Sequence, residues 1–522
     1  MMLRTDRVES AMQLNRDELF RFGTALIFIV GIMLFTIVRT DGGVDGILLV
    51  IAAMIGGYMA MNIGANDVAN NVGPAVGSHA ITLTGAIIIA ASFEAGGALI
   101  AGGDVVGTIK KGIIDPDLVA DRDTFIWLMI AALLAAAVWL NFATAVGAPV
   151  STTHSIVGGV LGAGIAAAGW DIANWNQVGM IAASWVISPL LGGLIAALFL
   201  YVIKRKITYK SDVLAAANTM VPLLVSLMAW AFGTYLMLKG VKQLIKVDFI
   251  TAVLMGLAIA VVVYVIMRPF IARSTQKLDN HKSSVNDLFT IPLIFAAALL
   301  SFAHGANDVA NAVGPLAGIN EAIVGGAVTS KASIPIWVMA VGAIGIALGL
   351  ALYGPKLIRT VGSEITELDK TRAFCIAMAA AITVIVASQL GLPVSSTHIA
   401  VGGVFGVGFL REYIKSSYAR TLQEIRDHHV ENDPAEVDAF LARFEEADVT
   451  TKGEMLREMK QQAAGTKLLA KRERRGLGQV HRIELVKRTL LLKIAAAWVI
   501  TVPLAGGLAA MFFFMIRGMM LP

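Results

Sequence analysis

Apolar stretches about as long as a lipid bilayer is thick recur from one end of this 522-residue chain to the other. A helix needs about 20 mostly apolar residues to cross a membrane, and lipid cannot supply partners for the exposed backbone of an open strand or loop. Runs that meet or approach this length lie near residues 22–38, 47–64, 83–103, 125–147, 178–203, 219–238, 249–268, 288–305, 334–353, 373–391 and 492–516. The sequence therefore predicts an all-α polytopic membrane protein.

The composition supports the same class. Hydrophobic residues make up 57% and charged residues 15% of the chain, against roughly 25% charged in soluble domains, and the mean hydropathy is +0.74. The first apolar run is followed by "RTDGGVDG", which lacks the small-residue pattern of a signal-peptide cleavage site, so we interpret the run as a span. Cys375 is the single cysteine, which excludes an intrachain disulfide. We expect a lipid bilayer as the surroundings and no nucleic-acid partner.

Four further apolar pieces are short, rich in glycine and interrupted. They lie near residues 66–80, 150–168, 308–319 and 395–410. Backbone that leaves its helix at membrane depth must be buried in protein or line a wet cavity. We therefore expect these four pieces, rather than the long spans, to carry the function.

An internal repeat relates the four pieces in pairs. "GANDVANNVGPAVG" from Gly64 and "GANDVANAVGPLAG" from Gly305 agree at 11 of 14 positions, and "PVSTTHSIVGGV" from Pro149 and "PVSSTHIAVGGV" from Pro393 agree at 9 of 12. The offsets, 241 and 244 residues, and the shared order of the motifs indicate a duplicated half. Duplicated halves with interrupted helices at matching positions are typical of secondary transporters whose site lies between the repeats.

The second motif pair places a proline ahead of three hydroxyl side chains. Proline suits the first turn of a helix, so Pro149 and Pro393 each predict a helix that starts inside the membrane. The free N–H groups, positive dipole end and hydroxyls of such a start suit a tetrahedral oxyanion; alternatively, the hydroxyls only cap their own helix. The candidate anion-binding residues are Ser151, Thr152, Thr153, Ser395, Ser396 and Thr397, with Gln389 as a further candidate just upstream.

The first motif pair brings carboxylates into the membrane with no Lys or Arg beside them. Such a group needs a partner, and two carboxylates near an oxyanion would repel it strongly. Bound cations remove the repulsion, and side-chain oxygens, with carbonyls freed by helix breaks at Gly64 and Gly305, are hard ligands that sodium accepts. The candidate sodium-binding residues are Asn66, Asp67, Asn70, Asn307, Asp308 and Asn311. Each half would then supply one cation site and one part of the anion site, which couples the two ligands.

These motif pairs resemble the signature of the inorganic phosphate transporter (PiT) family, in which each half carries one copy. The resemblance covers the chain apart from the N-terminal tail and the segment 411–490. It implies two inverted repeats with broken or re-entrant helices, about twelve transmembrane segments and often a homodimer. It also implies import of inorganic phosphate by symport with sodium or a proton, and no cofactor is expected. Sulfate and a neutral metal–phosphate complex remain alternative substrates.

A few other polar residues lie within apolar runs. Glu94 is interpreted as a coupling group, because the family has an acid linked to transport in a matching "FE" context; the alternative is a carboxyl paired with a hydroxyl on a neighbouring helix. His154, His398 and His304 are interpreted as hydrogen-bonded packing groups, with a proton carrier as the alternative.

Charge along the chain sets the expected organisation. The segment 411–490 is highly charged and predicts an extramembrane insertion. Basic loops at 204–210 and 268–282 indicate the cytoplasmic side of the cell (inner) membrane, and the insertion is expected there too. The expected units are 1–21 as an N-terminal tail, 22–203 as the first repeat, 204–287 as linking spans and loops, 288–410 as the second repeat, 411–490 as the insertion and 491–522 as the last transmembrane segment of the second repeat.

Two other functional classes fit the motifs less well. A channel has no need of a closed, duplicated constellation for both a cation and an anion. A membrane enzyme would need a nucleophile beside a base, and Ser151 with His154 has that spacing. Ser395 and His398 repeat the pair, and active sites seldom come in symmetric copies, so we expect a transporter rather than an enzyme.

Overall fold

The computed structural model describes residues 2–40, 42–145, 150–240, 247–325, 334–364, 368–428, 439, 442–443 and 488–520. Within these residues the chain is helical, apart from turns, short links and one isolated bridge between Ile114 and Ala173. The described part contains 11 helices long and apolar enough to cross a membrane, and a shorter apolar helix over Thr152–Ala168. The predicted all-α polytopic membrane class is confirmed.

Most helices follow the predicted apolar runs closely. In chain order they are α1 (Met2–Arg39), α2 (Gly43–Asn66), α3 (Ala69–Gly77), α4 (Leu83–Ala101), α5 (Gly103–Lys111), α6 (Arg122–Ala145), α7 (Thr152–Ala168), α8 (Trp175–Ile203), α9 (Val213–Lys239), α10 (Phe249–Thr275), α11 (Lys282–Leu288), α12 (Thr290–Asp308), α13 (Ala310–Gly325), α14 (Ile336–Glu364), α15 (Lys370–Gln389), α16 (Ser396–His428) and α20 (Arg488–Met520).

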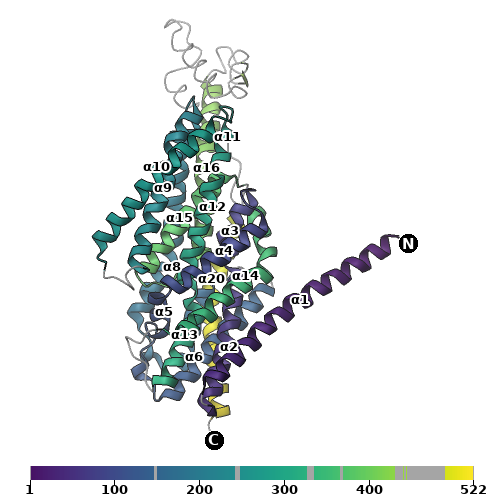
Figure 1. The fold of residues 1–522 in the computed structure, drawn as a ribbon, viewed down its shortest axis with the longest axis vertical. Coiled ribbons are helices and arrows are strands. Elements are labelled where there is room, and N and C mark those ends of the chain that lie inside the picture. The colour runs from purple at the N-terminus through teal and green to yellow at the C-terminus, as the bar shows by residue number, and fades with distance from the viewer. Residues whose placement is uncertain are drawn as a thin grey trace.

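The two halves of the chain are interleaved rather than side by side (Figure 1). Helix α2 packs against α14 of the other half, and α4 packs in the same way against α12. Likewise α7 packs against α20 and α8 against α16. Each of these contacts between halves therefore has a counterpart with the roles of the halves exchanged, as an internal repeat requires.

The helix breaks lie at the carboxylates and not at the glycines where the sequence placed them. Helix α2 continues through Gly64 to Asn66, and α12 continues through Gly305 to Asp308. The glycines serve close helix crossings instead, because a Cβ on Gly64 would lie 1.9 Å from the backbone oxygen of Ile346 and one on Gly305 would lie 2.1 Å from that of Glu94. The expectation of breaks at the glycines is therefore wrong by a few residues.

Both hydroxyl motifs begin a helix inside the protein, but α7 begins at Thr152 and α16 at Ser396, so the prolines at 149 and 393 precede the first turn instead of standing in it. Ser151 is the N-cap of α7 and accepts a hydrogen bond from the backbone N–H of His154 at 3.2 Å. Ser395 precedes α16 and accepts one from the N–H of His398 at 3.3 Å. Both serines are buried, so both helix starts lie within the bundle.

The loops at 204–210 and 268–282, which the sequence predicts on the same side of the membrane, lie at one end of the bundle. The backbone N–H of Val213 donates to Asn280 Oδ1 at 2.9 Å, which joins the turn before α9 to the turn after α10. Helix α11 and the far end of α16 lie at this same end, and the C-terminus lies at the opposite one (Figure 1). Helix α16 runs on to His428, past the expected start of the insertion at 411, and most of the insertion lies outside the described residues.

Candidate functional site

Four interrupted elements converge near the centre of the bundle. They are the α2–α3 junction with Asp67, the α12–α13 junction with Asp308, and the N-termini of α7 and α16. Asp67 is 2% exposed and Asp308 is 1% exposed. The contacts between these elements bring both GANDVAN motifs and both hydroxyl motifs into one buried polar cluster.

Asp67 joins the hydroxyl motifs of the two halves. Its Oδ2 accepts a hydrogen bond from Thr152 Oγ1 at 2.6 Å, and its Oδ1 accepts one from Thr397 Oγ1 at 3.1 Å. The two threonines are 245 positions apart in the sequence. A single carboxylate thus holds the starts of α7 and α16 together.

The paired asparagines make reciprocal contacts. Asn70 Nδ2 donates to Thr397 Oγ1 at 2.9 Å, which links the first GANDVAN motif to the second hydroxyl motif. Asn311 Nδ2 donates to Thr153 Oγ1 at 3.1 Å, which links the second GANDVAN motif to the first hydroxyl motif. Each GANDVAN motif therefore supports the hydroxyl motif of the opposite half.

Asp308 lies in a different environment from Asp67. Its Oδ2 lies 2.9 Å from His304 Nε2 and accepts a hydrogen bond from Ser396 Oγ at 3.3 Å. Within the described residues its Oδ1 is buried without a hydrogen-bond partner, and so is Oδ1 of Asn311. A buried acceptor without a partner is costly, so these two oxygens, three positions apart in sequence across the α12–α13 junction, could accept a ligand such as a cation.

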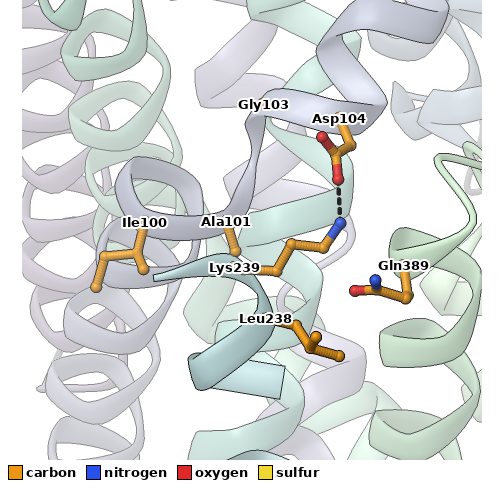
Figure 2. Close-up of a pocket in the computed structure, with 7 residues that line it drawn as sticks. All are labelled: Ile100, Ala101, Gly103, Asp104, Leu238, Lys239 and Gln389. Carbon is orange, nitrogen blue, oxygen red and sulfur yellow. Dashed lines mark hydrogen bonds and ion pairs between the residues drawn. The ribbon is translucent and has the colours of Figure 1, made fainter. Parts of the chain in front are cut away.

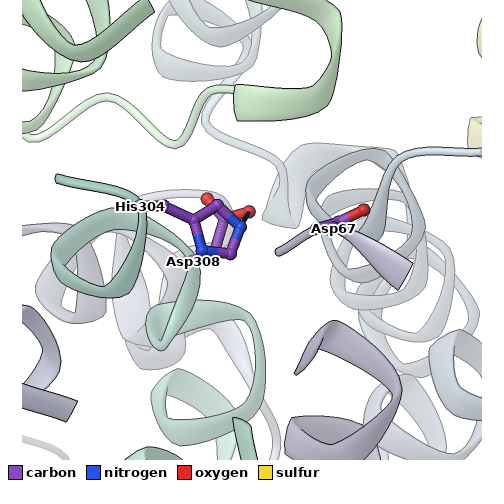
Figure 3. Close-up of side chains that lie close together, drawn as sticks. All are labelled: Asp67, His304 and Asp308. Atoms are coloured by element: carbon purple, nitrogen blue, oxygen red, sulfur yellow. Dashed lines mark ion pairs between the residues drawn. The ribbon is translucent and has the colours of Figure 1, made fainter. Parts of the chain in front are cut away.

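Three of these side chains could together hold a metal ion. Asp67, His304 and Asp308 each offer one ligand atom, and these atoms all lie within 4.8 Å of one another. Figure 3 shows His304 and Asp308 together on one side and Asp67 opposite them. Two carboxylate oxygens and an imidazole nitrogen form a donor set that suits a divalent cation such as Mn²⁺ or Zn²⁺.

Thr153 and Asn307 have structural partners. Thr153 Oγ1 donates to the backbone oxygen of Val394 at 3.1 Å. Asn307 Nδ2 donates to Ser388 Oγ at 2.9 Å, and its Oδ1 accepts from the backbone N–H of Val394 at 3.2 Å. Both bonds hold the link between α15 and α16. Asn66, the last residue of α2, is half-buried.

The structure places Gln389 apart from the predicted anion set. It is exposed at the end of α15, where it lines a cavity of about 300 Å³ together with Asp104 and Lys239. Figure 2 shows the ammonium of Lys239 directed to Asp104, with the Gln389 amide facing the same space. The loop 390–393 separates Gln389 from the hydroxyls of α16.

Glu94 is fully buried and has partners that the sequence did not indicate. Its Oε1 accepts a hydrogen bond from Asn71 Nδ2 at 2.8 Å, and its Oε2 lies 2.7 Å from His304 Nδ1. His304 therefore lies between the carboxyl groups of Glu94 and Asp308. The sequence carried one signal for Asn71, since it stands at a position where the two GANDVAN copies differ, with Ala312 in the other.

Comparisons with known proteins agree with this arrangement. Residues 63–509 match the model of the phosphate transporter family. A protein of Helicobacter pylori (strain J99) named "Putative phosphate permease" is 51% identical over 514 residues, which cover 97% of this chain and 96% of the relative. A protein of the same description from Thermococcus kodakarensis is 39% identical over 365 residues, covering 70% of this chain and 89% of the relative.

A solved structure has the same fold. The protein described as "The sodium-dependent phosphate transporter" matches with a TM-score of 0.72 and 31% sequence identity, over 91% of this chain and 100% of that one. The family and the fold are those of a transporter and not of an enzyme. The resemblance found in the motifs is confirmed, and the chain belongs to the phosphate transporter family.

Proposed function

We propose that this protein imports inorganic phosphate by symport with a cation, sodium or a proton, and that the anion binds between the N-termini of α7 and α16. The observation that carries the proposal is the pair of hydrogen bonds from Thr152 and Thr397 to Asp67. They bring one helix N-terminus from each half against the same buried carboxylate. Two positive dipole ends facing one space suit a multiply charged oxyanion.

The buried carboxylates account for the need for a cation. The described contacts of Asp67, Asp308 and Glu94 contain histidine, hydroxyl and amide groups but no Lys or Arg. Phosphate beside these carboxylates would be repelled strongly in surroundings of low dielectric constant. A cation bound to the carboxylate oxygens removes that repulsion, so each ligand favours the binding of the other.

The hydroxyl groups provide a second link between the ligands. A hydroxyl carries one hydrogen, and those of Thr152, Thr397 and Ser396 are donated to carboxylates. A cation that engages the carboxylates as ligands would compete with these bonds and leave the hydrogens for the oxygens of phosphate. In this proposal the cation prepares the anion site directly, through atoms that both ligands share.

The reciprocal helix contacts suit two inverted repeats that exchange access between the two faces of the membrane. The basic loops before α9 and after α10 lie beside each other, and short basic loops favour the cytoplasm. We place this end, with the insertion 411–490, on the cytoplasmic side of the inner membrane. A homodimer is proposed from the family resemblance alone and is tested by the mass of the purified protein in detergent.

A neutral metal–phosphate complex is the second candidate substrate. The observation that favours it is the donor set of Asp67, His304 and Asp308, whose ligand atoms lie within 4.8 Å of one another. In that case the co-transported cation would be divalent and would arrive together with the phosphate. Sulfate is a further tetrahedral anion that the same helix N-termini would suit.

Uptake of labelled phosphate into proteoliposomes distinguishes these possibilities. We expect accumulation driven by an imposed sodium or proton gradient, saturation with phosphate and weaker competition by sulfate. Dependence on a divalent metal, with uptake of labelled metal in equal amount, would favour the metal complex. Uptake that neither gradient nor metal affects would contradict the symport proposal, and release of phosphate from phosphate esters would indicate an enzyme.

A further inference from the structure

The cavity beside Gln389 is lined by residues that lie outside the four sequence motifs. It has a volume of about 300 Å³ and lies between the end of α4, the start of α5, the end of α9 and the end of α15 (Figure 2). Its polar lining consists of the Asp104 carboxylate, the Lys239 ammonium and the Gln389 amide. A water takes up about 30 Å³, so the cavity has room for a tetrahedral oxyanion together with several waters.

This cavity lies towards the side of the membrane opposite to the basic loops. Helix α9 starts at Val213, whose backbone N–H donates to Asn280 in the turn after α10, and this helix of 27 residues ends at Lys239. At 1.5 Å per residue α9 is about 40 Å long, which exceeds the roughly 30 Å of a bilayer core. With the basic loops in the cytoplasm, Lys239 lies towards the outside, from which an importer takes its substrate.

Lys239 brings a positive charge into the cavity. Its side chain is only 8% exposed, and its ammonium is paired with the carboxylate of Asp104, whose side chain is 60% exposed. An ion pair with so exposed a member contributes little to stability, so another anion can take the place of the carboxylate at low cost. Asp104 lies in the first turn of α5, where the helix dipole still favours its negative charge when the ammonium has another partner.

A short link separates the cavity from the candidate anion site. Residues 390–395 join α15 to α16. On the side of the cavity, Thr108 Oγ1 of α5 donates to the backbone oxygen of Gly391 at 2.7 Å. Further along the link, Thr153 Oγ1 of α7 donates to the backbone oxygen of Val394 at 3.1 Å. The same link therefore contacts a helix that borders the cavity and a hydroxyl motif of the candidate anion site.

We propose that this cavity is a second, outer binding site for the transported oxyanion, in which the ammonium of Lys239 and the amide of Gln389 hold the anion, and that Asp104 pairs with the ammonium while the site is empty. The inference rests on the proposed import of phosphate and adds a site to it. A phosphate-type oxyanion has oxygens that accept from both donors, and a largely buried ammonium attracts it more strongly than one in water. When the anion moves on towards the hydroxyl motifs, Asp104 pairs with Lys239 again.

Two substitutions with opposite expected effects test the outer site. Lys239→Gln removes the charge that attracts the anion, whereas Asp104→Asn removes the carboxylate that competes with it. Lys111→Gln is the matched control, because it removes the same charge from α5 at a position that lines a different cavity. The measurement is the initial rate of labelled phosphate uptake by proteoliposomes of the full-length protein over a range of phosphate concentrations, with size-exclusion chromatography as the check of folding.

We expect Lys239→Gln to raise the half-saturating phosphate concentration about tenfold, which corresponds to the loss of one hydrogen bond to a charged group, with the maximal rate nearly retained. Asp104→Asn should lower this concentration, the double variant should behave like Lys239→Gln, and Lys111→Gln should change it little. The inference is overturned if Lys239→Gln causes no shift, if Lys111→Gln shifts it equally, or if Asp104→Asn raises it as Lys239→Gln does, as a purely structural ion pair predicts. If Lys239→Gln fails to fold, Asp104→Asn decides, and an unchanged or higher concentration overturns the inference.

The headgroup of a lipid carries the same phosphate chemistry as the free anion. Uptake is therefore compared in vesicles of phosphatidylcholine alone and in vesicles that also contain anionic phosphatidylglycerol. The shift in Lys239→Gln should be the same in both, whereas a shift confined to vesicles with the anionic lipid would assign the cavity to a headgroup and overturn the inference. If the parent protein shows no saturable phosphate uptake in either kind of vesicle, the proposed import of phosphate is contradicted instead.

Discussion

Asp67 and Thr397, 330 residues apart, are joined by a hydrogen bond of 3.1 Å at the centre of the molecule. With the bond from Thr152 at 2.6 Å, it makes Asp67 the point where the two hydroxyl motifs meet. Asp67 therefore contacts both candidate anion-binding motifs, and substitutions there test both anion binding and its dependence on a cation.

Replacing Asp67 by asparagine should make phosphate binding less dependent on sodium. The change keeps the shape of the side chain but removes the charge that attracts the cation and that strengthens the hydrogen bonds from Thr152 and Thr397, and hydrogen bonds to charged groups contribute about 1.5–3 kcal/mol. Asp308→Asn is the matched variant in the other half. Binding of labelled phosphate in sodium and in choline buffer measures the sodium dependence of each variant. An unchanged sodium dependence in both variants would contradict a cation bound to these carboxylates.

Ser151 and Ser395 should behave as helix caps rather than as anion ligands. Each accepts a hydrogen bond from the backbone three residues ahead. Alanine at an N-cap costs about 1 kcal/mol of stability, and glycine only a few tenths. Thermal unfolding in detergent should therefore show a loss for Ser151→Ala that Ser151→Gly largely recovers, with phosphate affinity nearly constant in both. A loss of affinity of about tenfold or more in the glycine variant would assign this hydroxyl to the anion instead.

Gly305, where α12 crosses α4, should tolerate no side chain. A Cβ on Gly305 would lie 2.1 Å from the backbone oxygen of Glu94, so α4 and α12 would have to separate. Overpacking of this kind typically costs about 1–3 kcal/mol, and here it also displaces Glu94 from His304. Gly507 in α20 is the control, because a Cβ there meets nothing within 4 Å. Gly305→Ala should lower the unfolding temperature and abolish transport, whereas Gly507→Ala should do neither; similar behaviour of the two variants would contradict the crossing as the reason for Gly305.

Much of the architecture could be predicted because it follows from local pattern. The apolar run at 83–103 became α4 over Leu83–Ala101, and the prolines at 149 and 393 lie just ahead of the starts of α7 and α16. These features depend on the length of a span and on the chemistry of a helix's first turn, both of which can be read in a few consecutive residues.

The remaining features depend on which helices meet. Glu94 and His304 are 210 positions apart, and the sequence cannot show that α4 crosses α12 at Gly305. The similarity of the two GANDVAN copies also concealed the difference between Asp67 and Asp308, because that difference comes from Glu94 and His304, which lie outside the motif. Gln389 was grouped with the hydroxyls by its nearness in sequence, but the turn at 390–393 carries it into another cavity.

The ion pair of Lys110 and Glu321 should be essential to the stability of the fold. It joins α5, which follows the helix of Glu94, to α13, which follows Asp308, and its side chains are only 6% and 10% exposed. Removing one partner of a buried pair leaves an uncompensated charge and costs about 3–5 kcal/mol, whereas a well-packed apolar replacement of both is often neutral. Glu321→Leu should lower the unfolding temperature in detergent strongly because it leaves the Lys110 ammonium buried, and the double variant Lys110→Met with Glu321→Leu should recover most of the loss. A cavity of about 240 Å³ is lined by both residues; if water there screens the charge, Glu321→Leu will cost only about 1 kcal/mol or less, as for a surface pair, and the pair will not be needed to hold α5 against α13.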